Sequence, residues 1–158
     1  MLILDPDQFE KLKSDKELFY KTIGEVYCPY LGEKVSFNAK GLEHLKFKKK
    51  NHARSSEDQY VRFKLLHLAP EAVRLSKTIQ GISHTKTFEL VRSNARTEMI
   101  MKPVSYYEFI AILEDKRVRV VIKQVEAGPK YFWSIIPFWK VDKNSGKRKM
   151  SSGNLEEN

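Results

Sequence analysis

The sequence predicts an α+β protein in which N-terminal helices pack on a four-stranded antiparallel β-meander. The main observation is the segment 106–139, where three apolar runs are separated by short turn signals at 114–116 and 127–129. The runs are rich in Val, Ile, Phe, Tyr and Trp, which favour strands, and connections this short permit only antiparallel hairpins. The second observation is that apolar residues recur at helical spacing in several segments that precede the meander.

Four helices are expected before the meander, over residues 5–23, 39–47, 57–68 and 70–80. Asp5 is a good N-cap for the first helix and Asn38 for the second. Ser56 opens a capping-box pattern for the third helix. The fourth helix begins at Pro70 and is expected to end at Gly81, because proline suits a first helical position and glycine a C-terminal cap.

Shorter strands are expected outside the three runs. A hairpin is predicted over residues 25–37, and Pro29 marks its first arm as an edge strand because proline lacks an N–H donor. The first strand of the meander is predicted over 84–92, and residues 93–103 are predicted as a loop.

Three units are expected along the chain. Residues 1–24 form an N-terminal helix and residues 25–139 form the central domain with the meander. Residues 140–158 are polar and rich in Ser, Lys, Gly and Asn, so they are predicted as a disordered tail.

The middle strand of the meander carries one apolar and one cationic face. Side chains alternate along a strand, and Arg117, Arg119 and Lys123 occupy alternate positions with valine and isoleucine between them. Pairing across the glycine–proline turn then puts Ser134 opposite Val121, diagonal to two of these cations. No acidic residue is found on this strand face, so we expect its charge to serve an external anion.

The same alternation sorts the aromatic residues of the last strand. Phe132 and Ile136 are expected on the cationic face together with Ser134. Tyr131 and Trp133 are expected on the opposite face, packed in the core, although either side chain is of a type that stacks on a base.

The composition favours an anionic partner. The net charge is +9, and seven Lys or Arg face only two acidic residues in the interval 44–64. Such a run serves either as a solvated surface or as a contact for a phosphate backbone, and both interpretations are open. No apolar run reaches the ~20 residues of a membrane span, so no membrane association is expected and the cytoplasm is the expected compartment.

Several classes of chemistry find no support in the motifs. Cys28 is the one cysteine and is expected as a buried filler, and no Cys/His set has zinc-finger spacing. Nucleotide-binding glycine motifs and an acidic cluster for two metal ions are also missing, so no metal and no cofactor are expected. The basic face, several histidines and a serine remain. Histidine moves protons near neutral pH and Arg or Lys stabilises phosphate, which suits metal-independent RNA cleavage.

The order of elements also resembles a known superfamily. The motifs G-L-E-H-L at 41–45, R-V-R-V-V-I-K-Q at 117–124 and K-Y-F-W-S-I-I-P at 130–137 follow the layout of the BECR nucleases. This superfamily is named for barnase, EndoU, the colicins and RelE, and the chain looks most like its branch associated with phages and mobile elements. The resemblance covers roughly residues 25–138. It implies a BECR-like nuclease domain, endoribonuclease activity and a toxin-like role, with RNA as substrate.

The resemblance also implies roles for individual residues. A histidine on an N-terminal helix, basic residues on inner strands and a Ser or Thr on the last strand surround one cleft in such families. His44 is then the general base or acid, Arg119 and Lys123 bind the scissile phosphate, and Ser134 donates a hydrogen bond to it. The residues expected to bind flanking phosphates are Lys46, Arg54, Arg62 and Lys130. His52 is an alternative catalytic histidine, with His67 and His84 as weaker candidates.

Each of these residues also has a purely structural interpretation. His44 serves equally as a core or boundary histidine, the strand cations as a solvated sheet face, and Ser134 as a small strand residue. Two other functions therefore stay open beside RNA cleavage. One is a noncatalytic nucleic-acid-binding module, and the other is an interaction protein that docks an acidic partner such as an antitoxin or immunity protein.

Overall fold

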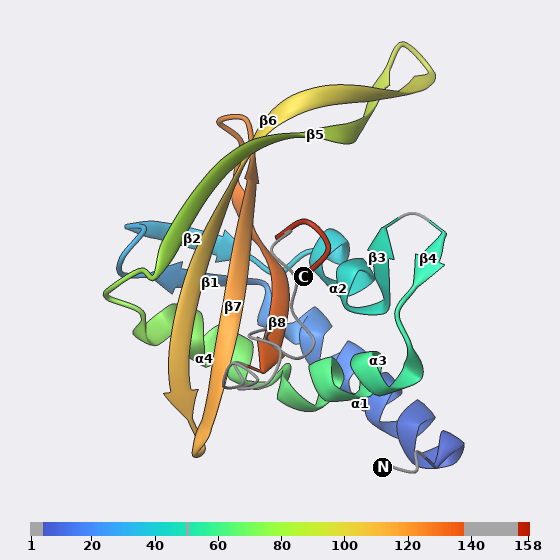
Figure 1. Cartoon of the computed structure of the whole chain (residues 1–158), viewed down its shortest axis with the longest axis vertical. Coiled ribbons are helices and arrows are strands. Elements are labelled where there is room, and N and C mark those ends of the chain that lie inside the picture. Colours follow the sequence, from blue (N-terminus) through green and yellow to red (C-terminus); the bar gives the residue numbers. More distant parts are fainter. Residues whose placement is uncertain (1–4, 50, 138–154) are drawn as a thin grey trace, which may run out of the picture.

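The computed structural model describes residues 5–49, 51–137 and 155–158 (Figure 1). Its helices are α1 (Pro6–Ile23), α2 (Ala39–Lys46), α3 (Ser56–Leu65) and α4 (Leu68–Leu75). Its strands are β1 (Glu25–Cys28), β2 (Glu33–Ser36), β3 (Phe47–Lys49), β4 (His52–Ala53), β5 (Gly81–Ser93), β6 (Arg96–Leu113), β7 (Lys116–Val125) and β8 (Lys130–Pro137). Among the described helices, none is both long and apolar enough to cross a membrane.

The α+β class is confirmed, but the sheet is larger than predicted. It has six strands in the order β1-β2-β8-β7-β6-β5, and β2 runs parallel to β8 through the pair Ser36 and Tyr131. The sheet is therefore mixed, not a separate four-stranded antiparallel meander. The hairpin β1–β2, with the predicted edge strand β1, joins the sheet because Cys28 and Val35 are fully buried in the same core as β7 and β8.

The first three helices begin close to where their sequences predicted. The side chain of Asp5 accepts a hydrogen bond from the N–H of Asp7, and that of Asn38 accepts from two N–H groups at the start of α2. Ser55 caps α3, one residue before the predicted Ser56, by accepting from the N–H of Asp58. Each cap satisfies main-chain donors that have no partner inside the helix.

Helix α4 ends earlier than predicted. It stops at Leu75. The main-chain N–H of Gln80 instead donates to the main-chain oxygen of Glu108 on β6 at 3.0 Å. Gly81 is the first residue of β5, where an added Cβ would lie 2.6 Å from a Glu108 carboxylate oxygen. The neighbouring atom is the flexible end of the Glu108 side chain, so the backbone does not require glycine here, and Gly81 pairs with Glu108 as an ordinary strand residue.

The segment 93–103, predicted as a loop, lies mostly in a long strand. Strands β5 and β6 pair continuously from Gly81 and Glu108 outward, and the turn falls at Asn94 and Ala95, which both have positive φ. The outer half of this β5–β6 hairpin projects well beyond the other strands (Figure 1). The main-chain N–H and C=O groups of its two strands bond to each other, and neither face of this part is buried. The alternation of apolar and polar residues that normally identifies a strand in a sequence is therefore missing.

A β-bulge in β8 changes which side chains share a face. The register pairs Val121 with Ser134, as predicted, but β8 then carries one extra residue, Trp133, before pairing resumes. Tyr131 consequently lies opposite Lys123 on the cationic face, and it packs there with Trp133. The prediction that these two aromatic residues face the core is wrong, because a bulge reverses the alternation on one side of it.

The opposite face of β7 and β8 forms the main core. Phe132, expected on the cationic face, is fully buried there and stacks on Phe37 at a centroid distance of 5.0 Å. Phe63 of α3 and Leu45 of α2 join the same cluster. The helices thus cover one face of the sheet, while the cationic face of β7 lies toward the β5–β6 hairpin.

Gly41 sets how closely α2 packs on β8. A Cβ at this position would collide with the main-chain oxygen of Phe132 and lie 2.7 Å from the Tyr20 hydroxyl. We therefore expect Gly41→Ala to lower the free energy of unfolding by about 1–3 kcal/mol, the usual cost of overpacking. Urea unfolding measures the change. Glu43→Ala, at an exposed position of the same helix, should change stability by less than about 0.5 kcal/mol, and an equal loss in both variants would contradict this packing role.

Candidate functional site

Four side chains from separate elements surround the main-chain oxygen of Asn158. Arg62 donates to it at 3.0 Å, Ser134 at 2.5 Å and Arg54 at 3.4 Å, while Nε2 of His44 lies 3.1 Å away. We call this arrangement the oxygen site. All four side chains are buried, so the site is a preformed internal arrangement of donors around one oxygen.

Three of the four side chains lie on helices or a strand, and Arg54 lies in the connection between β4 and α3. Helix α2 carries His44, one turn after Gly41, and the guanidinium of Arg54 donates through Nε to the main-chain oxygen of His44 at 2.9 Å. Arg62 lies on α3 and donates to the hydroxyl of Ser134 on β8 at 2.6 Å. Helices α2 and α3 and strand β8 therefore meet at this point.

Asp58 holds the two guanidinium groups together. Its carboxylate accepts from Arg62 at 2.6 Å and from Arg54 at 3.3 Å. Burial and the neighbouring Arg62 lower the pKa of Arg54 to about 10, and burial also lowers the pKa of Arg62. One carboxylate thus faces two buried cations, and an oxygen-bearing anion at the site would balance the excess positive charge.

His44 is neutral at physiological pH. Burial, followed by the charges of Arg54 and Arg62, holds its pKa well below 6.5. Nη2 of Arg54 lies 2.9 Å from Nε2 of His44, and a guanidinium only donates hydrogen bonds. The Asn158 oxygen, 3.1 Å from the same Nε2, only accepts, so these two contacts require opposite tautomers and do not fix the position of the imidazole proton. The ring stacks on Trp133 at 3.9 Å, which fixes its orientation.

Lys123 forms a second centre beside the oxygen site. Its ammonium binds Glu89 of β5 at 2.8 Å and Glu156 at 3.0 Å, and it lies 4.1 Å from the ring centre of Trp133. Trp133 also donates its indole N–H to the main-chain oxygen of Glu156 at 3.2 Å. Trp133 therefore connects the two centres, because its ring contacts both Lys123 and His44.

The cationic face has acidic partners within the sheet, contrary to the prediction. Glu89 of β5 pairs with Lys123, and Glu108 of β6 pairs with Arg119 at 3.5 Å. Both acids lie in segments that were predicted as strands, but their contacts with the cations of β7 depend on pairing between strands. Arg119 is buried on this face, and it forms an ion pair with Glu108.

The residues predicted for the site fall into two groups, those that meet at the two centres and those that form ion pairs elsewhere. The structure brings together His44, Lys123, Ser134, Arg54 and Arg62. Two predicted phosphate ligands point elsewhere, because Lys46 pairs with Glu17 of α1 at 3.2 Å and Lys130 with Glu33 of β2 at 2.9 Å.

The other histidines lie outside the oxygen site. His67 contacts Glu114 at 3.0 Å, and His84 contacts the Ser105 hydroxyl at 2.7 Å. His52 is exposed on β4 and lines the cavity described next.

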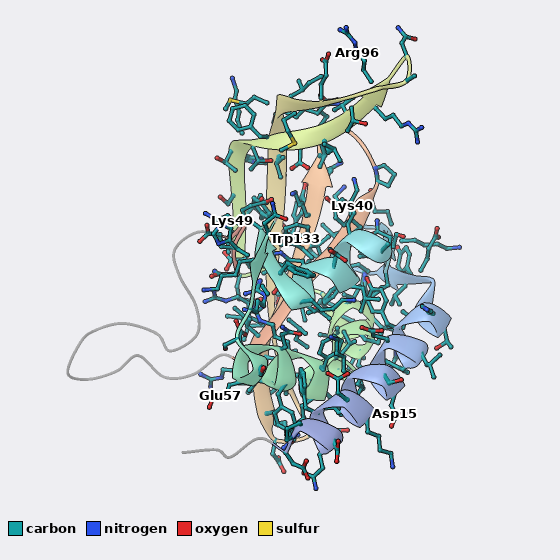
Figure 2. All side chains as sticks on the ribbon, turned by 90° about the vertical axis from the view of Figure 1, so that its right-hand side faces the viewer. Asp15, Lys40, Lys49, Glu57, Arg96 and Trp133 are labelled. Carbon is teal, nitrogen blue, oxygen red and sulfur yellow. The ribbon has the colours of Figure 1, made fainter. Side chains whose placement is uncertain are left out.

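A cavity of about 740 Å³ adjoins both centres. It lies between α2, the β3–β4 hairpin and the β5–β6 hairpin, and its wall includes Lys40, Lys49, Lys123 and Trp133. Figure 2 shows Trp133 between Lys49 and Lys40, below the projecting hairpin that carries Arg96 near its tip. The cavity is wide enough for a nucleotide and has both cations and aromatic rings in its wall.

Two contributions to the site were not predicted. The spacing of Asp58 and Arg62 is a visible signal for the contribution of Asp58, since residues four apart share a face of a helix. The contact of Glu156 and Asn158 with the site has no counterpart in the sequence pattern. Residues 155–158 were expected within the disordered tail, yet Asn158 is buried against β8 and α3. The rest of that tail, residues 140–154, lies outside the described residues.

In residues 5–49, 51–137 and 155–158 there is no cluster of three His, Cys, Asp or Glu side chains arranged to hold a metal ion. Comparison of the chain with protein-family models, with curated proteins and with solved structures finds no significant match.

Proposed function

We propose that the chain is an endoribonuclease that cleaves RNA without a metal ion, with the scissile phosphate bound at the oxygen site. The observation that carries the proposal is the convergence of an imidazole, two guanidinium groups and a hydroxyl on one oxygen. A phosphate oxygen is the group that such donors bind best, because guanidinium and hydroxyl groups supply charge and directed hydrogen bonds together.

The proposed reaction is attack of the RNA 2′-hydroxyl on the adjacent phosphorus. His44 is the general base, because its imidazole is neutral at neutral pH and one ring nitrogen of a neutral imidazole has a lone pair that accepts the 2′ proton. Arg54, Arg62 and Ser134 stabilise the negative charge that builds on the non-bridging oxygens. The bond to the 5′-oxygen breaks, and this oxygen takes a proton from solvent. The products are a 2′,3′-cyclic phosphate and a 5′-hydroxyl.

The resemblance to the BECR superfamily supports this proposal in part. A helix-borne histidine, His44, and a serine on the last strand, Ser134, contact the same oxygen, as the resemblance implies. The chain departs from the expectation in its cations. Arg54 and Arg62, expected at flanking phosphates, contact the same oxygen as His44 and Ser134. The BECR-like fold itself remains part of the proposal, with β5 to β8 as its antiparallel strands.

Incubation of the purified chain with RNA in excess EDTA tests the function. We expect fragments that end in 2′,3′-cyclic phosphate. RNA that stays intact but binds with a steep dependence on salt would instead identify a noncatalytic nucleic-acid-binding module. If RNA is neither cleaved nor bound, the endoribonuclease proposal is wrong.

A second candidate function has a specific observation in its favour. The site holds an acidic segment of its own chain, with Glu156 on Lys123 and Asn158 in the oxygen site. A site that accepts such a segment also suits an acidic protein partner, such as an antitoxin or immunity protein. Under this alternative, a peptide rich in Asp and Glu should bind the chain more tightly than RNA of equal charge.

A further inference from the structure

The segment Leu155–Asn158 fills both centres of the site. Asn158 supplies the oxygen bound by Arg62 and Ser134, and Glu157 supplies a main-chain oxygen to Arg54 at 2.9 Å. Glu156 places a carboxyl oxygen 3.0 Å from the Lys123 ammonium. The segment therefore puts oxygen atoms against three buried cations and one hydroxyl.

An apolar contact anchors the start of the same segment. Leu155 packs against the cluster that contains Tyr106, Val121, Tyr131 and Trp133. The segment thus binds through an apolar side chain, a carboxyl group and main-chain oxygens. This combination of an apolar face and spaced oxygens is also what a short single-stranded nucleic acid offers, through its bases and phosphates.

We propose that residues 155–158 are an internal competitor of the RNA, which occupy two neighbouring phosphate positions and must leave before substrate binds. The first position is the oxygen site and the second is at Lys123, where Glu156 is held. This inference rests on the proposed function, and it adds a second phosphate position and a regulatory state. The substrate then spans both positions with consecutive phosphates.

The charges around Glu156 make the docked segment sensitive to pH. Lys123 of β7 faces both Glu89 of β5 and Glu156, and one ammonium does not neutralise two carboxylates. Burial alone would raise the pKa of Glu89, but hydrogen bonds from Lys123 and Thr87 outweigh burial and lower it. Glu156 therefore takes up the proton: burial, then repulsion by Glu89 and Glu157, raises its pKa to about 8.

The sign of the pH effect follows from that shift. A carboxyl whose pKa is higher in the docked than in the free segment gains a proton on docking. Docking of Glu156 is then strongest at low pH and weakens as the pH rises from its ordinary pKa of 4.5 to about 8. We expect the docked population to fall over this range in the full chain. Glu156→Gln, which cannot ionise, should abolish the dependence.

The competitor is tested with a matched pair of variants, Glu156→Lys and Glu10→Lys. Both change the net charge equally, but only the first places a cation against Lys123, since Glu10 is an exposed residue of α1. We expect Glu156→Lys to bind a short RNA about tenfold more tightly than Glu10→Lys, since a hydrogen bond to a charged group is lost from the docked state. Equal affinities would overturn the inference, and neither variant threatens the core.

A direct readout comes from the indole N–H of Trp133, which is bonded to Glu156. The chain has two tryptophans, so its nitrogen–proton spectrum shows two indole signals, and Trp139→Phe assigns them. We expect RNA to move the Trp133 signal of the full chain toward its position in Glu156→Lys.

Failure of the competitor and failure of the function look different in this spectrum. If RNA binds and is cleaved while the Trp133 signal keeps its docked position, the competitor is overturned and the nuclease stands. If RNA changes the spectrum of no variant and the RNA itself stays intact, both proposals are wrong.

Discussion

His44→Ala is expected to slow RNA cleavage by about 10²- to 10⁴-fold, the usual contribution of a general base. Among the four groups at the oxygen site, His44 is the one with a lone pair available at neutral pH, because the two arginines and the serine serve as donors. The measurement is the cleavage rate of a labelled RNA under single-turnover conditions in EDTA.

Two further variants make the His44 result specific. His44→Gln keeps a polar side chain beside Arg54. If this variant is folded but cleaves slowly, the loss is one of chemistry and not of structure. His84→Ala removes an exposed histidine that contacts Ser105, and it should leave the rate unchanged. A rate in His44→Gln within a fewfold of the parent chain, with the fold intact, would contradict the assigned base.

Asp58→Asn is expected to lower the free energy of unfolding by about 3–5 kcal/mol, the cost of leaving a buried charge without its partner. The side chains of Arg54 and Arg62 are almost fully buried, and Asp58 accepts from both. Burial and then repulsion by Arg62 already lower the pKa of Arg54, so removal of the shared carboxylate leaves two cations facing each other. Urea unfolding at neutral pH measures the loss.

A surface pair provides the control for Asp58. Glu71 binds Arg74 at 2.7 Å, but both side chains are about half exposed. Glu71→Gln should leave the free energy of unfolding almost unchanged, because solvent screens an exposed pair. Inorganic phosphate should restore part of the stability of Asp58→Asn, since an anion at the oxygen site replaces the lost charge. Similar losses in the two variants, or no effect of phosphate, would contradict the account of the site.

Local sequence signals predicted the elements around the site well. Some features depend only on neighbouring residues, so a single sequence is enough to find them. These are the helix caps at Asp5 and Asn38 and the short turn between β7 and β8. The pairing of Val121 with Ser134 was also expected, but next to the turn Lys130 pairs with Gln124 and not with Val125, and the extra residue Trp133 restores the expected register. These local signals are enough to place His44 on a helix and Ser134 on a strand.

The errors share one physical cause, which is interaction between segments distant in the chain. The bulge at Trp133, the acids that reach β7 from β5 and β6, and the strand start at Gly81 all depend on tertiary pairing. Alternation along one strand does not reveal an extra residue in its neighbour. The contacts of Arg54 and Arg62 with the oxygen site have the same origin, because they form only when α3 packs beside β8.

The most direct test of the central claim compares one oligonucleotide sequence as RNA and as DNA, in excess EDTA. The claim is that a 2′-hydroxyl attacks a phosphate held by His44, Arg54, Arg62 and Ser134. We expect Glu156→Lys, in which the docked segment is released, to bind both strands and to cut only the RNA, leaving 2′,3′-cyclic phosphate ends. Cleavage of both strands at similar rates, or no cleavage of RNA by this variant, would contradict the claim.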